Sequence, residues 1–288
     1  MEEIAKVIDI RKVIRNSKSG FFKSLPDFLI NAIERLIHQD EMNATIYKCH
    51  EKSGVPFIND VLEDWNVKID IRKSENIPAS GRYIFVANHS VGALDSLAFL
   101  SMIYRFYPDV ISPSNELFNY IPNLHPVILG INVFGKNTRE TTEKLNLLFE
   151  SDTQVMIFPS GEVSRRTNGT ISDPLWQKTF ITKAVRYKRD VIPVHISGRN
   201  SNLFYNVADL RKLLGIKMYI ETILLPREMA KQRNSTITLT IGQVIPYKTF
   251  TNEMTHQEWA RYVKELVYSL PVKSNQTILN ISNHDKHY

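Results

Sequence analysis

Cysteine is almost missing from this chain, which has 288 residues and a single Cys49. One cysteine excludes an internal disulfide framework and any metal site built from several thiolates. Such sparing use of cysteine fits a protein of a reducing compartment. We therefore interpret Cys49 as a structural residue.

Long apolar runs are missing as well. No stretch approaches the 18 or so apolar residues that a membrane-spanning helix needs. The first twenty residues are charged throughout and lack the apolar core of a secretory signal. We expect a cytoplasmic protein that is either in solution or bound to a membrane surface without crossing it.

Several catalytic signatures are also absent. There is no Gly-x-Ser-x-Gly elbow, no phosphate-binding Gly-x-x-x-x-Gly-Lys-Ser/Thr loop and no dinucleotide fingerprint after a strand. No histidine pair has the His-Glu-x-x-His spacing of a zinc helix, so we expect no metal. A serine hydrolase of the α/β class is therefore unsupported.

Positive charge is in excess, with a formal net charge of +6 and a pI near 9.2. This balance favours anionic partners such as nucleic acid, acidic lipid surfaces, or phosphorylated and acylated cofactors. It is equally compatible with a basic surface that only keeps the protein soluble.

The order of apolar segments predicts an α/β domain. Short buried strands are expected at 82–88, 154–162 and 190–198, and a half-buried strand at 236–245. Helices are expected at 95–107, 175–188 and 255–270, the last opening with a Thr255–Glu258 capping box. Functional residues of such a fold are expected at the carboxyl ends of the strands.

Residues 21–38 have apolar side chains at helical spacing. This helix either packs on the core of its own domain or lies on lipid, where Lys18, Lys23 and Arg35 would suit acidic headgroups. We divide the chain into a helical segment 1–75 that carries the candidate membrane contact, an α/β domain 76–272 and a polar tail 273–288.

Residues 88–95, "NHSVGALD", follow the first buried strand. His89 and Asp95 lie six positions apart and could not meet on one continuous helix. Gly92 allows a bend, which would let Asp95 orient His89 as a general base, with Asn88 holding the loop. The alternative is an inert loop histidine beside an aspartate.

Four ordered stretches together resemble the PlsC-type glycerolipid acyltransferase family. They are "NHSVGALD", "GINVFGKNTR" (130–139), "FPSGEVSR" (158–165) and "VIPVHI" (191–196). The resemblance spans about 86–198. It implies a mixed, largely parallel sheet flanked by helices, preceded by an N-terminal helical segment.

The chain departs from the family pattern at two places. Five residues separate His89 from Asp95 where the family has four, and Ser160 and Glu162 stand where it has Glu and Thr. This variant is similar to a hemolysin-like branch that includes O-acyltransferases of ornithine and glycine lipid synthesis. Segments 37–43, 197–205 and 224–229 also look like that branch.

The resemblance implies a reaction and its residues. His89 would take the proton of an acceptor hydroxyl, and Asp95 would orient His89. The turn at Ser160 and Gly161 would supply backbone N–H groups to the oxyanion. Further substrate-binding candidates are Asn88, Glu162, Lys136, Arg165, Arg166 and Arg199, the arginines for an anionic headgroup.

The partners follow from the same resemblance. The donor would be a thioester of acyl carrier protein or coenzyme A, used as co-substrate without a cofactor, and the acceptor an N-acyl amino acid lipid. An apolar groove for acyl chains is expected beside the site. Residues 21–38 would contact the inner face of the cytoplasmic membrane, and no nucleic acid is expected.

Two alternatives remain open. The enzyme could instead be a 1-acylglycerol-3-phosphate (lysophosphatidic acid) acyltransferase of phospholipid synthesis. It could also be a non-catalytic lipid-binding or hemolysin-like membrane protein.

Overall fold

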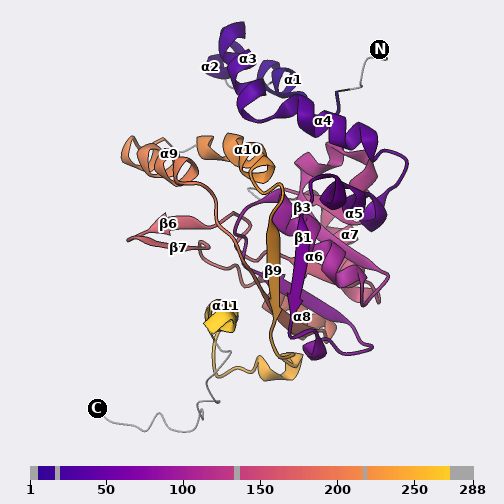
Figure 1. Cartoon of the computed structure of the whole chain (residues 1–288). Coiled ribbons are helices and arrows are strands. Elements are labelled where there is room, and N and C mark those ends of the chain that lie inside the picture. Colours follow the sequence, from indigo (N-terminus) through magenta and orange to yellow (C-terminus); the bar gives the residue numbers. More distant parts are fainter. Residues whose placement is uncertain (1–5, 17–19, 133–136, 217–218, 273–288) are drawn as a thin grey trace.

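One large mixed sheet forms the centre of the molecule (Figure 1). The computed structural model describes residues 6–16, 20–132, 137–216 and 219–272. The sheet has seven strands in the order β1-β9-β8-β2-β5-β3-β4. The predicted fold class, a mostly parallel mixed sheet flanked by helices, is confirmed.

Five adjacent strands are parallel, and two at one edge run the other way. The parallel set is β8 (Asp190–Ile196), β2 (Tyr83–Ala87), β5 (Gln154–Ile157), β3 (Val110–Asn115) and β4 (Ile128–Ile131). β9 (Thr236–Ile241) pairs antiparallel with β8, and β1 (Lys68–Arg72) pairs parallel with β9.

Strand β2 is buried along its whole length because helices cover both faces of the sheet. Phe85 and Ala87 face the apolar cluster of α5 (Gly54–Asp64) and α6 (Ala93–Tyr104). Ile84 and Val86 face the cluster of α8 (Thr179–Tyr187) and α11 (His256–Ser269). α7 (Arg139–Glu150) contributes its buried C-terminal turn to this second cluster. The carboxyl end of β2 therefore emerges from the densest part of the core.

Several expected elements are shorter in the structure. β5 stops at Ile157 instead of continuing to 162, because the chain turns at Pro159 and a proline has no N–H for the ladder. The helix expected from 175 begins only at Thr179. The capping box of Thr255 and Glu258 at the start of α11 is confirmed.

Strand β1 lies inside segment 1–75, which we expected to be helical. Residues 68–72 pair along β9, so the end of segment 1–75 belongs to the sheet. The half-buried pattern of "KIDIR" is typical of an edge strand, which has no partner on its outer side. The boundary at 75 therefore separates β1 from a sheet to which it belongs.

Four short helices precede α5. They are α1 (Ile10–Arg15), α2 (Gly20–Lys23), α3 (Asp27–Leu36) and α4 (Gln39–Lys48). The single helix expected over 21–38 is therefore two helices. Pro26 is the N-cap of α3. A proline disfavours helical geometry in the residue before it, so α2 does not continue through Leu25 into α3.

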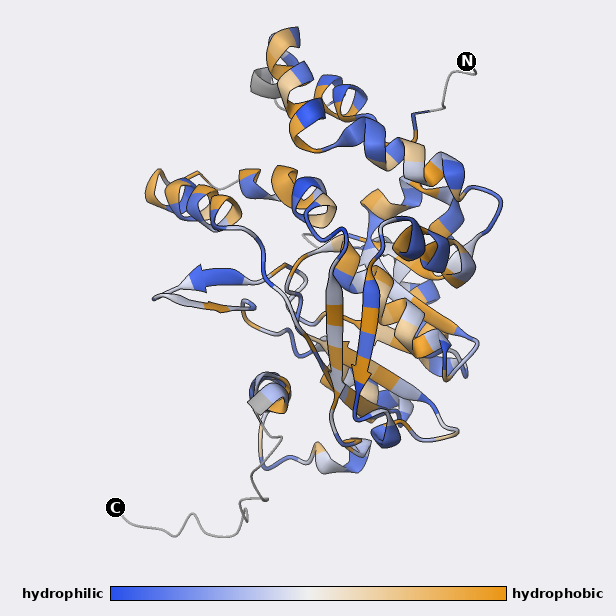
Figure 2. Cartoon of the chain, in the orientation of Figure 1, coloured by the Kyte–Doolittle hydropathy of each residue, from blue (hydrophilic) through white to orange (hydrophobic). Residues whose placement is uncertain are grey.

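A second group of elements lies beside the sheet. The hairpin of β6 (Arg165–Thr167) and β7 (Thr170–Ser172) packs against α9 (Asn202–Leu213), which is followed by α10 (Leu225–Ala230) (Figure 1). Figure 2 shows apolar residues on α9 and on the N-terminal helices, outside the sheet core. In the part of the chain that is described, no helix combines the length and apolarity needed to span a membrane.

Candidate active site

His89 and Asp95 meet at the carboxyl end of β2. The His89 Nδ1 atom lies 3.1 Å from Asp95 Oδ2, and this same oxygen accepts the backbone N–H groups of Val91 (2.7 Å) and Gly92 (3.2 Å). The Asp95 side chain is fully buried, whereas 15% of the His89 side chain is exposed. A carboxylate that accepts from Nδ1 leaves Nε2 unprotonated and able to take a proton.

Gly92 makes this contact possible. Its φ of +118° lies in a region that L-residues rarely adopt, and it is the N-cap of α6. A Cβ added there would meet Leu225 Cδ2 at 3.3 Å. The bend inferred from the sequence therefore exists, and α10 packs closely over it.

Phe158 lies directly on the imidazole of His89. The two rings are stacked, with centroids 4.1 Å apart and an interplanar angle of 15°. Phe158 belongs to the "FPSGEVSR" stretch, but the sequence held no signal that its ring would cover the histidine. The stacking limits rotation of the imidazole and shields one of its faces from water.

Asn88 has a holding role. Its amide donates to Ser90 Oγ and to the carbonyl oxygen of Ile196, and its Oδ1 accepts the N–H of Ile196. The side chain is buried and ties the loop after β2 to the end of β8. The structure thus places Asn88 behind the site and not at its surface.

The turn at residues 158–161 uses some of its own donors. The N–H of Gly161, whose φ is +66°, donates to the Phe158 carbonyl oxygen, and Ser160 Oγ donates to the Glu162 carbonyl oxygen. The Gly161 N–H is therefore occupied in this state. The expected role of Ser160 and Gly161 at an oxyanion stays a prediction.

Arg165 is buried in a network of charges. Its Nη2 lies 3.3 Å from Glu221 and 3.6 Å from Glu162, and Glu221 also pairs with Arg211 at 2.9 Å. The negative charge of Glu162 raises the pKa of the neighbouring Tyr219 phenol. Sequence reasoning missed Arg211 and Glu221, because nothing near either residue marks it as a partner of position 165.

The remaining basic candidates lie apart. Arg166 donates two hydrogen bonds to Asp209 on α9, at 2.9 and 2.7 Å. Arg199 is exposed and bonded to Asn202. Lys136 lies outside the described residues. The structure therefore places Arg165 closest to the "FPSGEVSR" turn and shows Arg166 holding the hairpin to α9.

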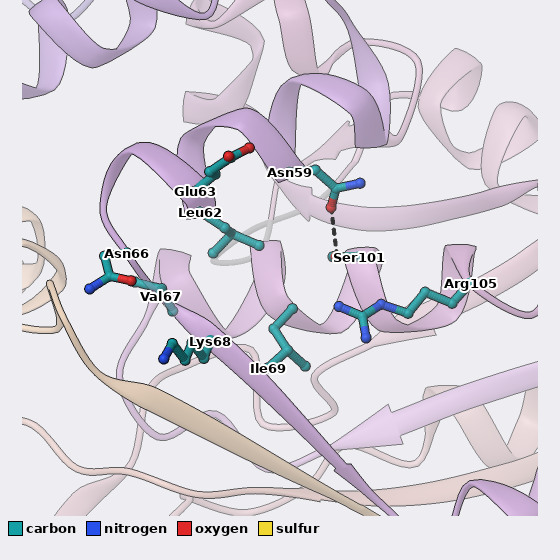
Figure 3. A pocket seen from close by; sticks show the side chains of 9 residues that line it. All are labelled: Asn59, Leu62, Glu63, Asn66, Val67, Lys68, Ile69, Ser101 and Arg105. Atoms are coloured by element: carbon teal, nitrogen blue, oxygen red, sulfur yellow. Dashed lines mark hydrogen bonds between the residues drawn. The ribbon is translucent and has the colours of Figure 1, made fainter.

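Figure 3 shows side chains that line a pocket between α5, β1 and α6. The volume of this pocket is about 440 Å³. Ser101 and Arg105 line it, and Ser101 lies six positions after Asp95 on α6, or about 9 Å along the helix at 1.5 Å per residue. A second hollow of about 330 Å³ lies between the start of α5 and β3. Neither is lined by His89, so neither is the apolar groove expected beside it.

Metal-binding groups are not gathered anywhere in the described ranges, where no three His, Cys, Asp or Glu side chains could hold one ion. Cys49 is buried, and burial raises the pKa of its thiol.

The fold and the site define a broad class: an α/β protein with a histidine–carboxylate pair at the carboxyl edge of a largely parallel sheet. A family model described as Acyltransferase matches residues 12–275. The chain therefore belongs to the acyltransferase family and is an acyltransferase.

Two curated relatives share this length. A lyso-glycine lipid O-acyltransferase of Bacteroides thetaiotaomicron is 39% identical over 92% of this chain and 97% of its own. A protein of the same name from Phocaeicola vulgatus is 38% identical over 92% and 95%. The crystal structure of the 1-acyl-sn-glycerophosphate acyltransferase PlsC from Thermotoga maritima aligns at a TM-score of 0.46, with 20% identity over 87% and 91% of the two chains.

Proposed function

We propose that this enzyme transfers a fatty acyl group to the hydroxyl of an N-acyl amino acid lipid of the lyso-glycine lipid type. The name shared by two relatives at 38–39% identity supports this acceptor. The observation that carries the mechanism is the contact of His89 Nδ1 with the buried Asp95.

In the proposed step His89 Nε2 takes the proton of the acceptor hydroxyl while its oxygen attacks the thioester carbonyl. Asp95 stabilises the imidazolium that forms. Collapse of the tetrahedral intermediate breaks the C–S bond, and the leaving thiolate takes the proton from the imidazolium. The products are an ester and a free thiol, and His89 returns to its starting state.

Arg165 and Arg211 are already paired with carboxylates of the protein, Glu162 and Glu221. Glu221 already pairs with Arg165 and Arg211, so two guanidinium groups share a fully buried carboxylate. A phosphate monoester carries about 1.5 to 2 negative charges and would need cations that are not already paired with carboxylates of the protein.

The donor is proposed to be a thioester of acyl carrier protein or coenzyme A, and the reaction needs neither a cofactor nor a metal. Each proton in the steps above is moved by His89, and no electron is transferred. The lipid acceptor implies work at a membrane, for which we propose the inner face of the cytoplasmic membrane.

The membrane contact is proposed to be α3 and its neighbours. Phe28 is 69% exposed, and Leu29 and Leu36 on the same helix are also exposed. Ile30 on that helix is fully buried against the protein, so α3 is held in place while its outer side chains face out. The side chains of Phe21 and Phe22 lie outside the described part of the structure.

The deciding experiment offers the purified protein an acyl thioester with either lyso-glycine lipid or lysophosphatidic acid and detects the product by mass spectrometry. We expect ester formation on lyso-glycine lipid and loss of that activity in His89→Ala. If the enzyme acylates lysophosphatidic acid and not lyso-glycine lipid, the proposed acceptor is wrong. Equal rates for wild type and His89→Ala would overturn the mechanism.

A further inference from the structure

The backbone of His89 is held by a carboxylate that lies 84 residues further along the chain. The His89 N–H donates to both oxygens of Asp173, at 3.1 and 3.2 Å. β2 ends at Ala87, so no strand partner holds the backbone of His89 in the sheet ladder. Asp173 thus binds the backbone N–H of His89 in place of a neighbouring strand.

Asp173 accepts two more hydrogen bonds. Ser164 Oγ donates to Oδ1 at 2.6 Å, and Trp176 Nε1 donates to Oδ2 at 2.9 Å. Ser164 also gives its backbone N–H to the His89 carbonyl oxygen at 2.6 Å. His89, Ser164 and Asp173 therefore form a closed triangle in which each residue is bonded to the other two.

The groups behind Asp173 hold it in turn. Its backbone N–H donates to Tyr268 Oη at 2.8 Å, and its carbonyl oxygen accepts from Lys264 Nζ at 2.6 Å, both on α11. Burial lowers the pKa of Lys264 and raises the pKa of Tyr268. His195 on β8 packs against Tyr268, and burial lowers its pKa as well. Asp173 itself is buried. A buried carboxylate with three donors is compensated, and losing it would leave those donors unpaired.

We propose that Asp173 is a positioning residue, which fixes the place of His89 relative to Asp95 and to the segment that carries Arg165. Asp173 follows β7 directly, and Arg165 begins the paired strand β6. Its hydrogen bonds therefore join the base to the hairpin that would face the acceptor headgroup. This inference rests on the proposed function, since it assigns Asp173 an effect through His89.

The test is a double-mutant cycle on kcat with purified full-length protein, an acyl thioester and lyso-glycine lipid, below the unfolding temperature of each variant. Asp173→Ala should lower kcat by about 10²-fold, the effect of misplacing a reacting group by about 1 Å. KM for the acceptor should change less than about threefold, because Asp173 does not touch it. Asp173→Asn keeps an acceptor oxygen for the His89 N–H and should recover part of the loss.

The double variant His89→Ala/Asp173→Ala separates positioning from a general loss of structure. If Asp173 acts through His89, the double variant is no slower than His89→Ala alone. Glu228→Ala is the matched control, because Glu228 is also buried and bonded to a loop, through the N–H and hydroxyl of Ser201. It should lower stability and leave kcat unchanged.

Two outcomes overturn the inference. One is a multiplicative loss in the double variant; the other is an Asp173→Ala rate within twofold of wild type while His89→Ala is inactive. An active His89→Ala would instead overturn the proposed mechanism. If Asp173→Ala does not fold, the same cycle is run with Asp173→Asn, for which we expect a loss of about tenfold.

Discussion

The carboxyl edge of the sheet and the N-terminal helices use charged and apolar residues in opposite ways. At and beside the sheet edge Asp95, Asp173 and Glu221 are buried, and each is paired with side chains or N–H groups of the protein. On α1 and α3 the ion pairs lie at the surface, and apolar side chains such as Phe28 are exposed beside them. Buried charges at the edge therefore set geometry, whereas the helices present a surface.

The largest expected effect is on the reaction. His89→Ala should lower kcat/KM by at least about 10²-fold, since a general base contributes about that much or more. Its unfolding temperature should stay close to that of the wild type. The control is His125→Ala, which removes an exposed histidine bonded to the Asn119 carbonyl oxygen and should leave the rate unchanged. Equal losses in both variants would contradict the assignment.

The second effect is on stability, at the buried charge network between β6 and α9. Glu221→Ala leaves Arg165 and Arg211 without their shared carboxylate in a buried site. Breaking a buried pair in this way costs about 3–5 kcal/mol. Urea unfolding measures this loss of unfolding free energy. Glu162→Ala is the milder control, because Glu162 is a half-buried partner of Arg165. A loss below about 1 kcal/mol would show that water reaches this network, as at a surface pair.

The third effect concerns membrane binding. Phe28→Ser with Leu29→Ser and Leu36→Ser should lower the fraction bound to acidic vesicles by at least about tenfold, since burying each such side chain is worth about 1.5–3 kcal/mol. Leu213→Ser with Leu214→Ser is the matched comparison, because these residues at the end of α9 are 83% and 63% exposed. If only the α9 variant loses vesicle binding, the membrane contact lies on α9 and not on α3.

The smallest effect is at a surface ion pair. Arg15 and Arg11 lower the pKa of Asp27, Arg15 having the larger part. A lowered carboxyl pKa adds stability at neutral pH, and this is lost as the pH falls through the lowered value. Asp27→Asn should therefore shift the unfolding midpoint slightly at pH 7, and this shift should shrink as the pH falls below the ordinary pKa of an aspartate. The difference should also fade in 1 M salt, where exposed charges are screened; a shift that persists there would contradict this.

Elements with a strong local pattern were predictable. The apolar runs at β2, β5 and β8 identified the central strands, and Thr255 with Glu258 marked the start of α11. β1 was missed because five mixed residues at a sheet edge carry little pattern of their own. The break at Pro26 divided a segment whose apolar spacing continues across it.

The candidate site was predictable in part for the same reason. His89, Gly92 and Asp95 are close in sequence, and the geometry of a strand, a bend and a helix start brings the two ends together. The residues that hold His89 come from far along the chain. Asp173 and Phe158 reach it through long-range contacts, which no local spacing encodes.

The sequence alone was enough to predict the class of fold, the family and the pairing of His89 with Asp95. Each of these depends on short-range periodicity or on motifs within a few residues. Packing settled the rest: that Arg165 is buried against Glu221, that Arg166 is bound to Asp209, and that Asp173 holds the base. These contacts join residues 43 to 84 positions apart, and they exist only once tertiary folding has brought those segments together.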